Sequence, residues 1–468
     1  MKKIGYFFIS NILLFSPVAL FGQTNADTSA VVVTLRQSVE FAFRNQPLLK
    51  QANIDEQINE RDIRIALSAW LPQVTTNGQY QHYFQRPAII AGGTSTGTGT
   101  GTGTGGTGTG TGSGTGSGVS QQNLAIAHNT SNVGLSASQV IYNNDVLQAS
   151  KASKYSRQFY KQNTESYKID LVSDVSKAFY DVLLSQRQLD IIKEDIVRLR
   201  RSLKDAYSRY QAGVVDKTDY KQATIALNNA LASQKQTQEA IKSKSAYLKQ
   251  AMGFDPNRRL VLSYDSASLQ TEAFIDTAQT LNYANRIEYR MLQTQKNLDQ
   301  INVSYYKWGF LPSLSAVGGY SLAYFNDNFS KLYNDAFPTS FAGLSLTIPI
   351  FQGGKRLQNL SKARLQVERT DLDLINSRNA INTEYTTALA NYKSAYYNWK
   401  VLNENVQLAT DVYKVVDLQY REGIKTYLDV IVAQADLRTA ELNFYNALFQ
   451  LLSSKIDLQR AMGTLPTE

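Results

Sequence analysis

Two long heptad seams, rows of apolar residues spaced for one side of a coiled-coil helix, constrain this chain more than any other feature. In the second seam, apolar residues recur at alternating steps of four and three, with no polar interruption. Its positions are Ile381, Tyr385, Ala388, Tyr392, Ala395, Trp399, Leu402, Val406, Ala409, Tyr413, Val416 and Tyr420. Subtracting 210 from each number gives a first seam from Leu171 to Tyr210, in which only Ser185 is polar. This period predicts two long coiled-coil helices and an internal two-fold repeat.

Both seams end in the same way. The first closes with Tyr210-Gln211-Ala212-Gly213 and the second with Tyr420-Arg421-Glu422-Gly423. A glycine directly after a helix end favours the left-handed backbone conformation that stops a helix. Helical periodicity resumes a few residues later, so we expect two antiparallel helical hairpins. Their long helices are expected over 146–210 and 355–420, each roughly 100 Å long at 1.5 Å per residue, and their second helices over 217–252 and 427–462.

Strand patterns precede each long helix. Helical periodicity over 35–70 stops at Leu71-Pro72, and the pattern over 277–310 stops at the equivalent Pro312, because the residue before a proline avoids the helical region. Apolar and polar residues then alternate with a period of two, which is typical of strands with two different faces. The strand segments follow Pro72, lie near 132–142 and occupy the hairpin 313–350.

A run of only Gly, Thr and Ser, residues 92–118, separates the first two predicted strands. Pro72 matches Pro312 at an offset of 240, whereas Gly213 matches Gly423 at an offset of 210. The difference, 240 minus 210, places 30 extra residues between the two strands. Since this composition cannot bury a core, we interpret the run as a loop that joins a hairpin, not as a linker between domains.

The chain is expected to begin with a signal peptide, residues 1–22, in which Met1-Lys2-Lys3 precedes an apolar stretch. A first structural repeat, residues 23–262, and a second, residues 263–468, follow it. Each contains a helix, a strand hairpin, a long helix and a second helix. Cysteine is absent, which suits an oxidising compartment and excludes a lipid anchor on an N-terminal cysteine.

Neither catalysis nor nucleic-acid binding is predicted. The formal charge is +9, but the basic residues alternate with acids along helix faces and form no stripe with aromatic residues. His82 and His128, the only histidines, have no cysteine or clustered acid beside them in sequence. Gly353-Gly354-Lys355 lacks the spacing of a phosphate-binding loop. We therefore expect no enzyme activity, no catalytic residue, no cofactor and no metal ligand.

Membrane crossing would fall to the strands, because no segment after the signal peptide is long and apolar enough for a transmembrane helix. Four strands cannot close a barrel, so the chain must oligomerise; two copies would supply eight strands and three copies twelve. Long helices continuing from such strands would form a tube that carries solutes across the periplasm and the outer membrane. The alternative is a surface coiled-coil protein, structural or adhesive, without transport activity.

Taken together and in order, these features resemble the TolC family of outer-membrane efflux proteins. The resemblance rests on the two-fold repeat, the Leu-Pro junctions, the strand-to-helix signals Ile141-Tyr142 and Ile350-Phe351-Gln352-Gly353, and the paired Tyr-x-x-Gly turns. It implies a mixed α and β membrane protein: a homotrimer with a twelve-stranded barrel in outer-membrane lipid and an α-helical periplasmic tunnel. It also implies the role of exit duct in a tripartite efflux or type I secretion system of a Gram-negative bacterium.

The resemblance further implies two partners: a periplasmic adaptor and an inner-membrane pump of the RND, ABC or MFS type. We expect the adaptor to dock on Tyr210, Gly213, Tyr420 and Gly423, because these residues close the hairpins at the end farthest from the strands.

In the family, a carboxylate six residues after the tip glycine narrows the pore and bridges to basic residues of neighbouring helices. Asp219 and Asp429 match that position, and Lys425 matches a basic partner, so these three are the candidate gate. A further family acid is replaced here by Val432. In the alternative interpretation, the pairs Asp216 with Asp219 and Thr426 with Asp429 are N-cap and N3 residues that stabilise helix starts.

Overall fold

The computed structural model describes residues 31–85, 127–263, 269, 271–277 and 279–466. The signal peptide and the Gly/Thr/Ser run predicted above lie outside the described residues. The chain forms two compact units. Unit 1 comprises Met1–Glu56, Phe159–Gln293 and Leu372–Glu468, and unit 2 comprises Gln57–Gln158 and Thr294–Asp371.

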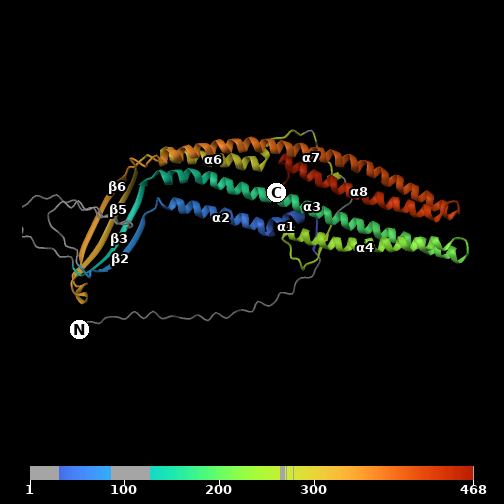
Figure 1. The fold of residues 1–468 in the computed structure, drawn as a ribbon, viewed down its shortest axis with the longest axis horizontal. Coiled ribbons are helices and arrows are strands. Elements are labelled where there is room, and N and C mark those ends of the chain that lie inside the picture. The colour runs from blue at the N-terminus through green and yellow to red at the C-terminus, as the bar shows by residue number, and fades with distance from the viewer. Residues whose placement is uncertain (1–30, 86–126, 264–268, 270, 278, 467–468) are drawn as a thin grey trace, which may run out of the picture. The chain divides into compact units, whose positions relative to one another are not determined.

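Unit 2 contains a four-stranded antiparallel sheet in the order β2-β3-β5-β6 (Figure 1). Its strands are β2 (Gln73–His82), β3 (Asn129–Tyr142), β5 (Ser313–Asn326) and β6 (Phe337–Thr347). Because β2 pairs with β3, the chain between them connects two neighbouring strands, as the register of the repeat predicts. The outer strands β2 and β6 each have only one neighbour among the described strands.

The register of the sheet gathers apolar residues on one face. Thr76 pairs with Leu135, Leu135 pairs in turn with Tyr320, and the same face continues through Leu314 opposite Leu346. On the other face, the residues of β2 and β3 that pair with each other are polar or glycine, among them Gln73, Thr75, Asn77, Gln79, Asn132, Gly134, Ser136 and Ser138. Side chains of this apolar face remain exposed within the single chain; Leu135 is 51% exposed and Leu344 is 71% exposed.

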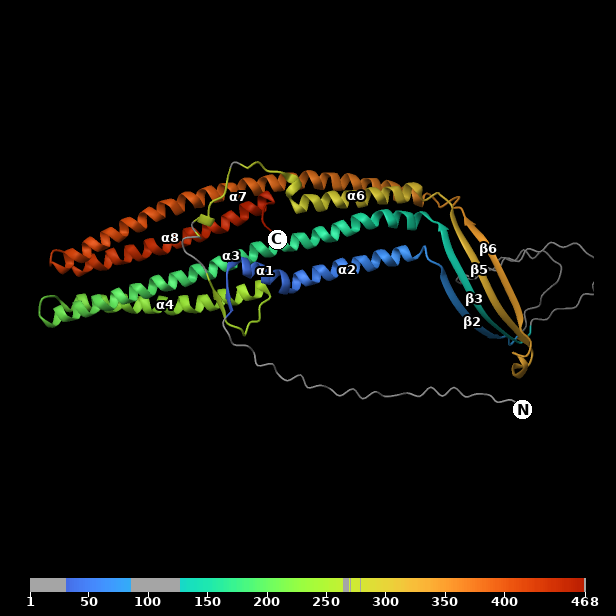
Figure 2. The same ribbon diagram turned by 180° about the vertical axis from the view of Figure 1, so that it is seen from behind.

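Unit 1 holds most of the two helical hairpins, in which α3 lies beside α4 and α7 beside α8 (Figure 2); the first parts of α3 and α7 belong to unit 2. The helices are α3 (Asn144–Gln211), α4 (Lys217–Met252), α7 (Lys355–Arg421) and α8 (Tyr427–Met462), close to the predicted bounds. Every position of both heptad seams is buried or half-buried. A large core joins α3 to α8 through residues such as Val175, Phe179, Leu448 and Leu451.

Ser185, the polar exception in the first seam, is fully satisfied. Its side chain is 1% exposed and donates a hydrogen bond to the Asp181 carbonyl at 2.9 Å. It accepts one from Lys244 Nζ of α4 at 2.8 Å. The same Lys244 also bonds the Asp181 carboxylate at 2.8 Å. A polar seam position is tolerated here because the neighbouring helix supplies its partner.

Three predicted boundaries need correction. The single helix expected over 35–70 is two helices, α1 (Leu35–Asn45) and α2 (Pro47–Ser68), because Gln46 precedes a proline and is extended. The helix expected over 277–310 begins only at Ile287, as α6 (Ile287–Trp308), after a short 3₁₀ turn. The last strand stops at Thr347, before Pro349, because proline has no N–H for the ladder.

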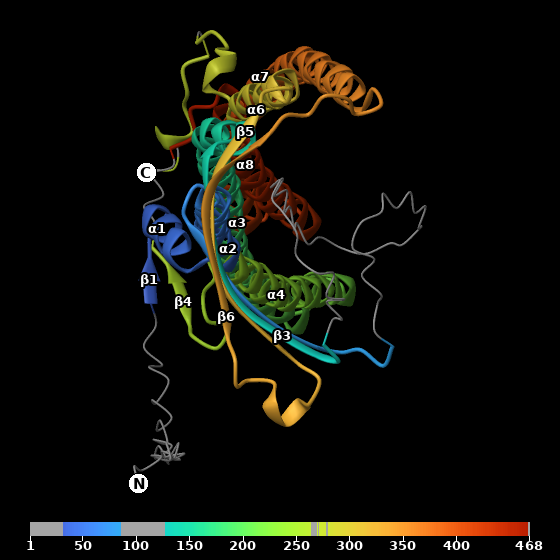
Figure 3. The same cartoon turned by 90° about the vertical axis from the view of Figure 1, so that its left-hand side faces the viewer.

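A second, small sheet was not predicted. β1 (Val31–Val33) pairs in parallel with β4 (Leu260–Leu262), beside α1 (Figure 3). Each strand is only three residues long, and the two lie more than 200 positions apart in sequence. Periodicity within a short window cannot reveal such a pairing.

The far ends of the two second helices make matching contacts. Gly253 and Gly463 both have positive φ, +64° and +69°. A Cβ on Gly253 would lie 2.8 Å from the Asn45 carbonyl, and a Cβ on Gly463 would lie 2.7 Å from the Asn285 carbonyl. Two constraints therefore require glycine at each position: the backbone conformation and the close approach of another segment of the same chain.

Candidate functional site

The two hairpin turns have the same backbone structure. The N–H of Gly213 donates to the Tyr210 carbonyl at 3.0 Å, and the N–H of Gly423 donates to the Tyr420 carbonyl at 3.1 Å. In each turn the N–H of the residue after the glycine donates to the carbonyl of the residue before the tyrosine, at 3.0 Å in the first turn and 2.8 Å in the second. Both are Schellman turns, with glycine φ values of +74° and +79°. An added Cβ would meet no atom within 4 Å, so only the backbone conformation requires glycine here.

The start of α8 is held by a capping box. Thr426 Oγ1 accepts a hydrogen bond from the Asp429 N–H at 3.4 Å, and the Asp429 carboxylate accepts from the Thr426 N–H at 2.9 Å. The Thr426 hydroxyl also donates to that carboxylate at 2.7 Å. These bonds, with a smaller contribution from Lys425, lower the pKa of Asp429. Lys425 Nζ lies 4.0 Å from Asp429 Oδ1.

The start of α4 lacks this device. Asp216 has the extended conformation of an N-cap residue, φ −74° and ψ 158°, but its side chain makes no capping hydrogen bond. Asp216 and Asp219 do occupy the predicted N-cap and N3 positions, but the Asp216 side chain makes no capping hydrogen bond there. The Asp216 carboxylate instead accepts a hydrogen bond from the Thr218 hydroxyl at 3.4 Å.

Aromatic residues join the two tips inside unit 1. Tyr420 and Tyr427 of the second hairpin are 7% and 2% exposed, with ring centroids 5.8 Å apart. They share a small core with Ala206 and Ala223 of the first hairpin. The Arg209 guanidinium of α3 lies 4.4 Å from the centre of the Tyr420 ring, within the range of a cation–π interaction.

Burial raises the pKa of both tyrosines, and the nearby carboxylates of Asp219 and Asp205 raise it further. Arg209 acts in the opposite direction on the pKa of Tyr420. Asp219 therefore lies close to the aromatic core of the tips. Among the ion pairs within the described chain, Lys425 is paired with Asp429 and not with Asp219.

The four predicted docking residues do not share one environment. Tyr420 is buried, and the half-buried Tyr210 packs on Tyr220 with ring centroids 5.1 Å apart. The apolar side chains exposed at the turns are instead Val214, at 69%, and Ile424, at 72%. Our sequence reasoning missed these two residues, although their equivalent positions directly after each tip glycine could have indicated them.

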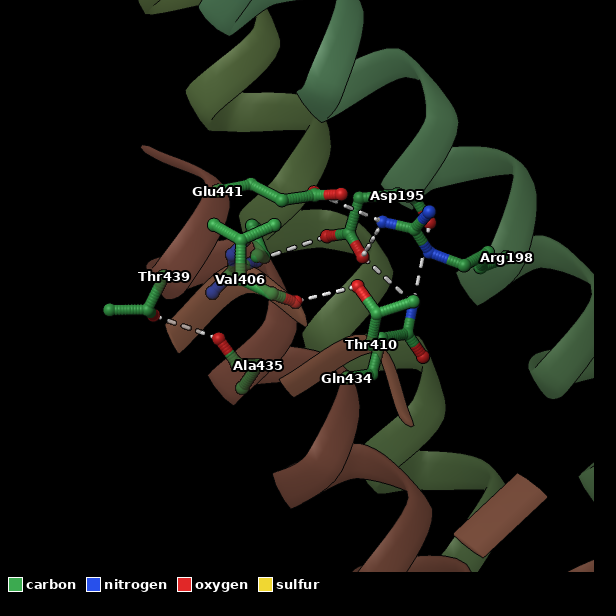
Figure 4. Close-up of polar contacts among 9 residues, drawn as sticks. Asp195, Arg198, Val406, Thr410, Gln434, Ala435, Thr439 and Glu441 are labelled. Carbon is green, nitrogen blue, oxygen red and sulfur yellow. Dashed lines mark hydrogen bonds and ion pairs between the residues drawn. The ribbon is translucent and has the colours of Figure 1, made fainter. Parts of the chain in front are cut away.

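A buried carboxylate further along α3 was also missed. Asp195 is 1% exposed, and its Oδ1 accepts a hydrogen bond from Gln434 Nε2 of α8 at 2.8 Å (Figure 4). Its Oδ2 accepts from Arg438 Nη1 at 3.2 Å, and Arg198 Nη2 lies 3.6 Å from Oδ1. Asp195 therefore ties the first hairpin to the second inside unit 1. Its position beside the seam residue Ile196 was the available signal.

The described residues contain no group of three or more His, Cys, Asp or Glu side chains placed to hold a metal ion. None of their helices combines the length and the apolar character needed to cross a membrane.

Comparison with known proteins identifies the family. The profile of the family described as "Outer membrane efflux protein" matches residues 39–254 and 284–464. Outer membrane protein TolC of Vibrio cholerae is 23% identical over 339 residues, 71% of this chain and 76% of that protein. Protein CyaE of Bordetella pertussis is 25% identical over 301 residues, 63% of this chain and 62% of that protein.

Solved structures agree at the level of fold. The outer membrane protein VceC of Vibrio cholerae superposes with a TM-score of 0.68 at 14% identity, over 92% of this chain and 96% of that one. The CmeC outer membrane channel of Campylobacter jejuni gives 0.69 at 17% identity, over 93% and 86%. With a family match over most of its length, this chain belongs to the outer membrane efflux protein family.

Proposed function

We propose that three copies of this chain form an outer-membrane exit duct, in which four strands from each copy close a twelve-stranded barrel. The observation that carries this proposal is the four-stranded sheet of unit 2, with an apolar face and two outer strands that each have only one neighbour among the described strands. Unpaired strand edges are not stable in lipid, so a sheet that crosses a bilayer must close. Twelve strands also leave room for an aqueous lumen, which eight strands fill with side chains.

The chain is an efflux channel of the outer membrane, not an enzyme, as its family is. In our proposal the long coiled-coil helices form a periplasmic tunnel. A periplasmic adaptor and an inner-membrane pump of the RND, ABC or MFS type deliver solutes to it. The competing idea of a surface coiled-coil adhesin has no support among the relatives.

The two structural repeats, 23–262 and 263–468, are part of the same proposal. The matching contacts of Gly253 with Asn45 and of Gly463 with Asn285 support them, as do the two identical Schellman turns. Duplication would give each chain two similar hairpins, so that three chains supply six to the tunnel.

Reconstitution tests the duct. Purified protein in a planar bilayer should give discrete conductance steps, and native mass spectrometry should give the mass of three chains. A correctly folded protein that never conducts would contradict the channel proposal. A conducting assembly of two or four chains would contradict the twelve-stranded barrel alone.

We further propose that the tips dock the adaptor through Gly213, Gly423 and the exposed side chains that follow them, with Tyr210 and Tyr420 holding the turns in shape. Replacing Val214 and Ile424 by serine should weaken in-cell crosslinking to the adaptor and reduce efflux, with trimer yield unchanged. The control is Gln211→Ser, which changes a polar residue beside the same turn. Efflux at the wild-type level in the double variant would exclude this docking surface.

The proposed gate consists of Asp219, Lys425 and Asp429 acting between hairpins, with Asp219 to Lys425 of a neighbouring chain as the main link. The support is that the Asp429 carboxylate already accepts hydrogen bonds from Thr426, whereas the start of α4, where Asp219 lies, has no side-chain capping bond. Exposed ion pairs contribute about 1 kcal/mol or less, so three copies must act together.

Asp219→Asn with Lys425→Gln should therefore increase single-channel conductance, whereas the control Asp216→Asn should leave it unchanged. Unchanged conductance in the double variant would leave Asp219 without a gating role.

A further inference from the structure

His82 and His128, the two histidines of the chain, lie together where β2 and β3 end. The ring centroids are 6.1 Å apart and the ring planes are inclined by only 23°. The hairpin ladder holds them there: His82 pairs with Asn129, and the Tyr83 N–H donates to the His128 carbonyl at 2.8 Å. Two imidazoles that are 46 positions apart in sequence, 128 minus 82, thus become neighbours.

The hydrogen bond of His128 fixes its tautomer. Nδ1 of His128 lies 2.9 Å from the backbone carbonyl of Tyr83. A carbonyl oxygen can only accept, so Nδ1 must carry the proton. The neutral ring then has its free lone pair on Nε2.

His82 reaches the same state through Asn129, whose side chain is 3% exposed. The Asn129 amide nitrogen donates to the carbonyls of Asn326 at 3.2 Å and Asp327 at 3.0 Å. These bonds fix the orientation of the amide, so its oxygen faces His82 Nδ1, 2.8 Å away, and must accept from it. His82 therefore also has its free lone pair on Nε2.

An imidazole whose Nδ1–H is bonded to an oxygen, leaving Nε2 bare, is the state in which proteins hold histidine for metal binding. We propose that His82 and His128 bind one divalent transition-metal ion through their two Nε2 atoms, with water completing the coordination. Imidazole suits Zn²⁺, Ni²⁺ and Cu²⁺, and Cu²⁺ binds tightest in this series. His82 is exposed and His128 half-buried, so an ion can enter from solvent.

The site closes the ends of the segment that connects β2 to β3. Binding joins the last residue of β2 to the residue before β3, so the metal adds a link at the base of the hairpin. This ion would be structural, and the proposal is independent of what the channel transports.

Copper titration of the untagged, full-length protein in detergent tests the site, because a histidine tag would itself bind the ion. Equilibrium dialysis should find one Cu²⁺ per chain, and the electron paramagnetic resonance spectrum should show two nitrogen ligands. His82→Ala and His128→Ala should each weaken binding at least tenfold. Asn129→Ala, which removes the bond that orients His82, should weaken it about tenfold.

The matched control is Tyr83→Phe, which changes a residue between the two histidines but keeps its backbone carbonyl and both rings. It should bind copper as the wild type does. Binding that survives either single histidine variant would overturn the proposal, as would a spectrum with a single nitrogen ligand. Circular dichroism of each variant separates loss of the site from loss of the fold.

Discussion

The two hairpin tips have the same turn but different helix starts. Both turns are Schellman motifs whose glycines have φ values within a few degrees of each other, +74° and +79°. After the turn, α8 begins with a capping box built on Thr426, whereas α4 begins at Asp216 without a capping bond. Backbone geometry is thus common to both tips, while the side-chain chemistry of the helix start differs.

This difference decides which charged side chains remain available for contacts outside their own tip. In the second tip, Asp429 is bonded to Thr426, and Lys425 lies beside it. In the first tip, Asp216 and Asp219 carry two negative charges without a cap between them. We infer that the first tip offers acids to its surroundings, while the second engages its acid internally, through Thr426 and Lys425.

The largest expected effect is a loss of stability when the polar contact between the two hairpins is broken. The two hairpins contribute different groups to this contact. The first supplies the Asp195 carboxylate, and the second supplies Gln434 and Arg438. Asp195→Ala would leave buried donors without an acceptor, and we expect the free energy of unfolding to fall by about 3 kcal/mol. Urea unfolding followed by circular dichroism measures it.

Gln434→Ala serves as the matched variant, because it removes one neutral donor and leaves the arginine pair intact. This variant should lower the free energy of unfolding by about 1 kcal/mol. Equal losses in the two variants would show that the charge of Asp195 is not what ties the hairpins together.

The second prediction compares the helix starts. Thr426→Ala removes the capping box and should lower stability by about 1 kcal/mol, whereas Asp216→Ala removes no capping bond and should cost much less. Hydrogen exchange resolved by peptide should show faster exchange at the start of α8 in the first variant. If both variants loosened their helices equally, the contrast between the tips would fail.

The smallest effect is a pH dependence confined to the second tip. The folded pKa of Asp429 lies below its ordinary value of 3.8, so its contribution is complete above that pH. It is lost as pH falls through the lower, folded pKa. The difference in melting temperature between wild type and Asp429→Asn should therefore be constant from pH 5 to 7 and shrink below about pH 3.8. If the difference in melting temperature persists at lower pH, the stabilising effect of Asp429 does not come from its charge.

Much of the fold could be predicted because heptad spacing and strand alternation are local signals. The bounds of α4 and α8 match the prediction to the residue. The break at Gln46 was missed, although Pro47 could have indicated it, and the predicted start of α6 was too early in the sequence. At the tips, the left-handed conformation of both glycines was predicted correctly. The missing capping bond of Asp216 and the core that Tyr420 shares with the first hairpin were not predicted.

The sequence by itself determined where helices and strands lie and where the hairpins turn, since a period of 3.5 or 2 residues and a glycine of positive φ act within a few residues. Only the tertiary structure decided which polar groups meet. Arg438 bonds an aspartate 243 residues away, and Asn129 bonds a carbonyl 198 residues away. No local pattern encodes such pairs, because a buried hydrogen bond depends on the distance and direction between two atoms, which only the packed chain sets.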